Sequence, residues 1–80
     1  MKNVFGEFLR TKREKMDISQ KEISDLLGWG TPQFISNCER GKAMLPMQYA
    51  KKVAKRLNIN PKDMEKMYLD QFKAKLKKYL

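Results

Sequence analysis

The chain has 80 residues, which is enough for one domain with a thin core. Eighteen lysines and arginines outnumber nine aspartates and glutamates, and the net charge of +9 favours a polyanionic partner such as nucleic acid or an acidic membrane surface. The absence of histidine and the single cysteine exclude an internal disulfide and weigh against zinc chemistry and most hydrolytic enzymes. We therefore expect a non-enzymatic protein with no metal, cofactor or small-molecule ligand. No apolar run approaches the roughly 18 residues that span a bilayer, so a cytoplasmic location is expected.

The apolar pattern predicts an all-α fold with five helices. Apolar residues recur every three or four positions, and no segment alternates with the period of a strand. The first helix is expected from about Asn3 to Met16, with Phe5, Phe8 and Leu9 on its buried face.

A capping box marks the start of the second helix. The Ser19 hydroxyl is expected to accept from the backbone N–H of Glu22, while the Glu22 carboxylate reaches back to the N–H of Ser19. Gly28 is a natural end of this helix. Its buried stripe is expected to consist of Ile23, Leu26 and Leu27.

The third helix begins after a turn at Trp29 and Gly30. Thr31 is expected to cap it, and Pro32 is expected to take its first helical position. The helix should end near Gly41. Its apolar positions are Phe34, Ile35 and Cys38.

Two further helices follow. The fourth is expected from Pro46 to Leu57, and the fifth runs from Asn60, its cap, to the C-terminus. Residues 1–80 are therefore interpreted as a single domain, with a helix-turn-helix unit at 19–41 and an extended C-terminal helix at 61–80. That last helix carries apolar residues at four-residue spacing: Met64, Tyr68, Phe72, Leu76 and Leu80.

The segment from residue 19 to residue 41 resembles a known motif. The runs that carry the resemblance are Ser19-Gln20-Lys21-Glu22-Ile23, Leu26-Leu27-Gly28, Ile35-Ser36 and Glu39-Arg40-Gly41. Together they look like the helix-turn-helix of the phage repressor and Cro family (XRE-like), and the resemblance extends from about Leu9 to Ile59. It implies a compact lambda-repressor-like domain that binds a palindromic operator as a dimer.

The turn departs from the family pattern. From Gly28 to Ile35 the chain has one residue more than the family usually has, and the extra residue is best placed at Gly30. The register of the third helix is therefore open by one residue.

The polar face of the third helix holds the residues expected to read bases: Gln33, Ser36 and Asn37. Glutamine and asparagine amides pair bidentately with the N6 and N7 edge of adenine. Positions 33 and 37 are one helical turn apart, so both side chains can reach the same groove. An ordinary solvated face is the alternative.

Phe34 matches a family position that is usually small and polar and faces DNA. Its ring could contact thymine methyl groups, or it could fold back beside Trp29 and Ile35. Some family members have an arginine near position 47 that enters the minor groove. This chain has Met47 there, so no minor-groove contact is expected.

Other residues are expected to hold phosphates or the domain itself. The resemblance implies that Gln20 contacts a phosphate and can also reach a base edge, and Thr31 can donate to a phosphate as well as cap its helix. The cations expected to clamp phosphates are Lys12, Arg40 and Lys42. Arg13 and Glu39 match a pair that forms a structural salt bridge in similar proteins.

The C-terminal helix is the candidate dimer interface, through Phe72, Leu76, Tyr79 and Leu80. The alternatives are that it packs on the domain and frays at its end, or that it docks on an acidic membrane or on a partner protein, as in an antitoxin. The sequence thus predicts a DNA-binding transcription regulator, most simply a repressor, with a protein- or membrane-interaction module as the alternative.

Overall fold

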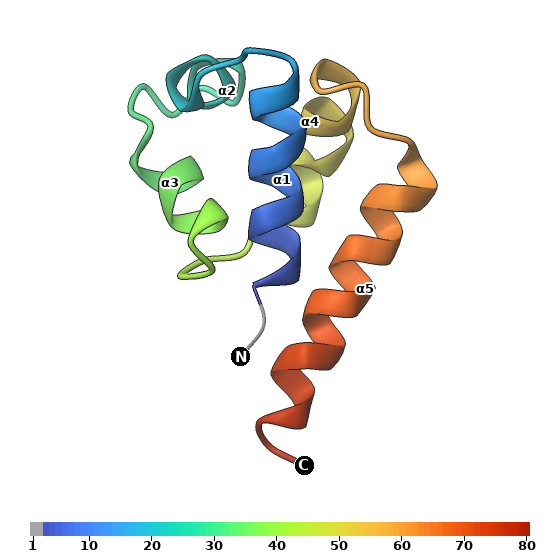
Figure 1. Cartoon of the computed structure of the whole chain (residues 1–80). Helices are drawn as coiled ribbons and strands as arrows, with labels where there is room; N and C mark the ends of the chain where they lie inside the picture. Colours follow the sequence, from blue (N-terminus) through green and yellow to red (C-terminus); the bar gives the residue numbers. More distant parts are fainter. Residues whose placement is uncertain (1–2) are drawn as a thin grey trace.

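A computed structural model describes residues 3–80 of the chain, and within that range the secondary structure is helical throughout (Figure 1). The elements are α1 (Val4–Lys15), α2 (Gln20–Leu26), α3 (Gln33–Glu39), the 3₁₀ turn η1 (Met47–Tyr49), α4 (Ala50–Arg56) and α5 (Pro61–Lys77). The predicted all-α class and the five α-helices are confirmed.

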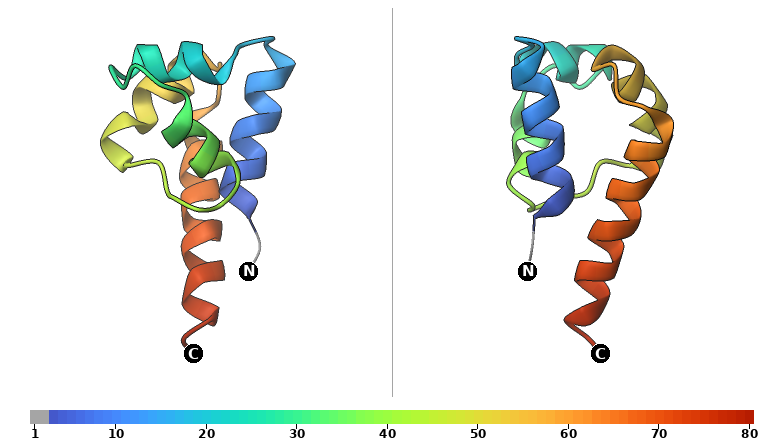
Figure 2. Two further views of the ribbon diagram at one scale, coloured as in Figure 1. Left: turned by 90° about the vertical axis from the view of Figure 1, so that its left-hand side faces the viewer. Right: turned by 45° about the vertical axis from the view of Figure 1, so that its right-hand side comes forward.

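α1 occupies the middle of the molecule. It lies between α3 and α5 and packs against both (Figure 1). α2 contacts α3, and α4 contacts α5. Both views in Figure 2 show the C-terminal part of α5 reaching beyond the other helices. The arrangement leaves α3 and the end of α5 as separate surfaces of the domain.

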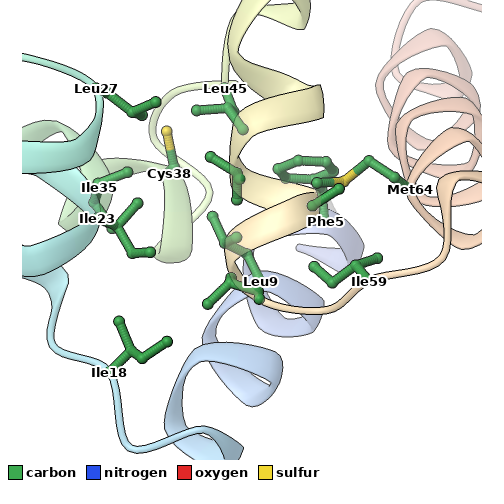
Figure 3. Close-up of a cluster of buried hydrophobic side chains, with 13 residues drawn as sticks. Phe5, Leu9, Ile18, Ile23, Leu27, Ile35, Cys38, Leu45, Ile59 and Met64 are labelled. Carbon is green, nitrogen blue, oxygen red and sulfur yellow. The ribbon is translucent and has the colours of Figure 1, made fainter.

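The hydrophobic core lies where the first four helices meet and is closed by the start of α5 (Figure 3). Burying a large aliphatic or aromatic side chain stabilises a fold by about 1.5–3 kcal/mol, so this cluster supplies most of the favourable free energy. Its members are Phe5, Leu9, Ile18, Ile23, Leu27, Ile35, Cys38, Leu45, Val53, Ala54, Leu57, Ile59 and Met64.

A Schellman motif closes the C-terminal end of α2, before the turn of the helix-turn-helix unit. After α2, Gly28 has a φ of +79°, the N–H of Gly28 donates to the Asp25 carbonyl at 3.1 Å, and the N–H of Trp29 donates to the Ser24 carbonyl at 2.9 Å. Gly30 also has a positive φ, +71°, in keeping with an extra residue in the turn. These bonds reverse the chain between α2 and α3.

The capping box at α2 is only half formed. The Ser19 hydroxyl accepts from the N–H of Glu22 at 3.0 Å, as predicted. The Glu22 carboxylate instead pairs with Arg56 of α4, so its predicted return to Ser19 is wrong. The prediction that Leu26 belongs to the buried stripe of α2 is also wrong, because Leu26 is 37% exposed. Ser24, two residues earlier, is buried.

Two helix starts differ from the prediction. α3 begins at Gln33 with Pro32 in the cap position, one residue later than predicted. The Thr31 hydroxyl still accepts from the N–H of Gln33 at 3.0 Å, so the capping bond predicted for Thr31 is present. The predicted helix from Pro46 begins as the separate 3₁₀ turn η1 before α4.

Candidate nucleic-acid interface

The outward face of α3 carries a row of three polar side chains. The Gln33 amide donates to Oδ1 of Asn37 at 3.2 Å, and the Arg40 guanidinium donates to the same oxygen at 3.0 Å. Gln33 and Arg40 are exposed, and Asn37 and Ser36 are half-buried. We call Gln33, Asn37 and Arg40 the α3 row. Its amides can exchange these exposed bonds for bonds to base edges.

The opposite side of α3 is buried and includes Ile35, Cys38 and Glu39. Burial raises the pKa of the Cys38 thiol to about 11, and the nearby Glu39 carboxylate adds to the shift. A thiol that stays protonated and covered is a poor nucleophile, so Cys38 acts as a small core side chain.

Arg13 and Glu39 form a bidentate ion pair that joins α1 to the end of α3. Arg13 donates from Nε to Oε2 of Glu39 at 2.7 Å and from Nη2 to Oε1 at 3.0 Å. The guanidinium also donates to the Ile18 carbonyl at 2.8 Å, and the Gln20 amide donates to Oε1 of Glu39 at 3.0 Å. The hydrogen bond to Glu39 raises the pKa of Arg13 above its ordinary value. The network ties the start of α2 and the end of α3 to α1.

A second connection between α1 and α3 lies at the start of α1. The side chain of Asn3 accepts from the N–H of Gly6 at 3.2 Å and donates to the Glu39 carbonyl at 2.7 Å. An added Cβ on Gly6 would lie 2.5 Å from the Cys38 carbonyl oxygen and 2.6 Å from that of Glu39. The two helices therefore approach closely only because residue 6 is glycine.

Sequence reasoning assigned no role to Gly6 and treated Asn3 only as a helix start. The available signal was a glycine within an otherwise helical pattern, which often marks a packing contact.

Gln71 fastens α5 to α1, which the sequence analysis did not predict. Only 4% of Gln71 is exposed, and its Oε1 accepts from the N–H of Phe5 at 3.1 Å. Nearby, the Tyr68 hydroxyl donates to the Leu45 carbonyl at 2.8 Å. A polar residue within the apolar stripe was the signal that could have indicated this contact.

The apolar stripe of α5 divides into two parts. Met64 is buried, and Met67 and Tyr68 pack against the core. The side chains placed at the predicted dimer interface are exposed: Phe72 (63%), Leu76, Tyr79 and Leu80 (94%). The helix was predicted to reach Leu80 but ends at Lys77, so Tyr79 and Leu80 lie beyond it.

Phe34 packs beside Trp29, one of the two arrangements that the sequence left open. The ring centroids are 4.6 Å apart in an edge-to-face contact, and Phe34 remains half-buried rather than fully covered.

The other residues predicted to contact phosphates lie at different distances from α3. Lys42 is exposed just after α3, where its backbone N–H donates to the Asn37 carbonyl at 2.9 Å. Thr31 is exposed before α3. Lys12 lies on α1 and is therefore not part of the α3 row. Its ammonium is 5.5 Å from the centroid of the Phe8 ring.

Within residues 3–80, none of the helices combines the length and the apolar composition that crossing a membrane requires. The same residues place no group of three or more histidine, cysteine, aspartate or glutamate side chains where it could hold a metal ion.

Comparison with known proteins places the chain in a family. The helix-turn-helix family HTH_3 matches residues 9–64, which include α1 from Leu9 through the start of α5. Searches of curated proteins and of solved structures gave no match. Because the family match covers more than half of the chain and contains the geometry described above, the chain belongs to the XRE-like helix-turn-helix family of DNA-binding transcription regulators.

Proposed function

We propose that this domain acts as a repressor that binds a palindromic operator as a homodimer, with α3 in the major groove. The observation that carries this proposal is the α3 row on a helix whose buried end is held by the Arg13–Glu39 pair. Such a scaffold fixes the direction of the amides before DNA arrives, so little conformational entropy is lost on binding.

Within this proposal the contacts divide into two kinds. Gln33, Asn37 and Ser36 contact base edges, which gives sequence specificity. Phosphate contacts position the domain without specifying sequence. They are assigned to Lys12, Gln20, Thr31, Arg40 and Lys42. Occupation of an operator that overlaps a promoter excludes polymerase and gives repression.

Binding-site selection from a pool of random duplexes tests the proposal. The expected result is an enriched palindrome whose half-sites are about one helical turn apart, because two copies of α3 must enter successive major grooves. A pool with no enriched sequence would contradict sequence-specific binding. An enriched site without twofold symmetry would contradict the homodimer.

DNA affinity is expected to fall steeply with salt. Lysines and arginines that neutralise phosphates release condensed counterions, and a dimer with about eight phosphate contacts gives a log–log slope near −7. Lys42→Ala should make the slope per protomer shallower by about 1, measured by fluorescence anisotropy over a salt series. Lys66→Ala is the matched control, because Lys66 pairs with Asp70 on α5 and should leave the slope unchanged. A salt-independent affinity would contradict phosphate binding.

The exposed end of α5 supports the homodimer. Phe72 and Leu76 lie one helical turn apart on this helix and face solvent, and Tyr79 and Leu80 extend the apolar surface. Pairing with a second copy removes these side chains from water while the lysines of this segment stay outside. Those lysines are Lys73, Lys75, Lys77 and Lys78.

Replacing both Phe72 and Leu76 by serine is expected to yield a folded monomer that binds one half-site weakly. Sedimentation at matched micromolar concentrations measures the change in oligomeric state, and thermal unfolding checks the fold. Met16→Ser is the control, because Met16 is an apolar side chain of similar exposure to Leu76 but lies at the end of α1. A native chain that sediments as a monomer, or a double variant that remains dimeric, would contradict this interface.

The same surface favours one alternative function. An exposed apolar helix face flanked by lysines can also dock on a partner protein or an acidic membrane, in an antitoxin-like role. A monomeric native chain in the sedimentation experiment is the result that would favour this alternative.

A further inference from the structure

A cleft lies beside α3, between the turn that precedes this helix and η1. Its aromatic lining consists of Trp29, Phe34 and Tyr49. Its amide lining consists of Gln33 and Asn37 from α3 and Gln48 from η1. Because Gln33 and Asn37 also belong to the α3 row, the cleft adjoins the side chains proposed to meet the bases.

The three aromatic rings support one another. The centroid of Trp29 is 4.6 Å from that of Phe34 and 5.0 Å from that of Tyr49, and both pairs are close to perpendicular. Edge-to-face contacts of this kind stabilise aromatic clusters. All three side chains are only half-buried, so the cluster presents apolar surface to the cleft.

The chemistry of the lining matches one kind of base pair. None of the residues that line the cleft is charged, whereas guanine is read best by arginine or lysine. Amide side chains match the N6 and N7 edge of adenine, and apolar side chains match the 5-methyl group of thymine. The cleft offers both features within one space.

We propose that this cleft is a subsite for an A·T base pair, in which the thymine methyl group packs against Phe34 and an amide contacts the adenine. Gln48, exposed on η1, becomes a further specificity-determining residue. The inference rests on the proposed DNA-binding function and deepens it by naming the base pair that the domain prefers.

Replacement of thymine by uracil tests the subsite, because it removes the methyl group and preserves base pairing. In the duplex obtained by selection, each thymine is replaced in turn, and the affinity is measured at one salt concentration. Replacement of one thymine per half-site should lower the affinity of the native protein for the duplex about three- to tenfold, because the methyl group that packs against the apolar surface is removed. The same replacement should have no effect on the Phe34→Ala variant.

A second variant keeps the test decisive if Phe34→Ala fails to fold. Gln48→Ala alters an exposed side chain and should lower the preference for A·T over G·C at that position by about fivefold or more. Uracil that costs nothing at any position, or a selected half-site without A·T pairs, overturns the subsite while DNA binding stands. Uracil sensitivity that persists in Phe34→Ala, or an unchanged base preference in Gln48→Ala, overturns the assignment to this cleft. A pool without any enriched sequence overturns the proposed function itself.

Discussion

Replacing Glu39 by alanine is expected to lower the free energy of unfolding by about 3–5 kcal/mol, the range for removing one partner of a buried ion pair. The side chain of Glu39 is 3% exposed and that of Arg13 is 12% exposed, so the guanidinium left behind has little access to water. The Gln20 amide loses its acceptor in the same change. Denaturant unfolding followed by circular dichroism measures the effect.

Asp25→Ala is the matched control for this measurement. Asp25 pairs with Lys21 on α2, but both side chains are more than half exposed, and exposed pairs of this kind contribute about 0.2–1 kcal/mol. Because the pKa of Arg13 is raised, the charged guanidinium contributes fully to the free energy of unfolding at every pH below its ordinary pKa. This contribution is lost only at strongly alkaline pH. The loss in Glu39→Ala should therefore be constant across the neutral range. A loss no greater than that of Asp25→Ala would contradict a structural role for the pair.

Gly6→Ala is expected to lower the free energy of unfolding by about 1–3 kcal/mol, which is the cost of overpacking a well-packed contact. The new Cβ would meet the Asn3 side chain and the carbonyl oxygens of Cys38 and Glu39, and the backbone atoms among these cannot move without displacing the end of α3.

The sign of the Gly6→Ala effect distinguishes a close helix contact from an unconstrained helix position. At an unconstrained interior helix position, changing glycine to alanine stabilises a protein by about 0.5–1 kcal/mol. Thr11→Ala, at an exposed position of the same helix, is the control and should be neutral or slightly stabilising. A Gly6→Ala variant as stable as the native chain would show that α1 and α3 do not approach as closely as described.

Local patterns predicted most of the fold. Apolar periodicity, the Ser19 cap and the breaks at Gly28 and Asn60 act within a few residues, so the order and type of the helices could be worked out from the sequence. Leu26 shows the limit of this reasoning. The buried face of α2 is centred on Ile23, Ser24 and Leu27, and which side of a short helix faces the core depends on its neighbours.

The missed contacts between helices join residues that are far apart in the chain. Gln71 meets the N–H of Phe5, and Glu22 meets Arg56, across separations that no local pattern encodes. In the candidate site, the spacing of Gln33 and Asn37 was sufficient to predict a shared face. Their cleft with Gln48 was not predictable, because it depends on how η1 packs beside α3.

The central claim is that the amides of the α3 row read bases, and one comparison of affinities tests it most directly. Gln33→Ala and Asn37→Ala are each measured against the selected duplex and against a scrambled duplex at the same salt concentration. Each lost bidentate contact should cost about 1–3 kcal/mol of discrimination, or roughly 5- to 150-fold on the selected duplex, with little change on the scrambled one. Variants that bind the selected duplex as tightly as the native chain, or that weaken equally on both duplexes, would contradict the claim.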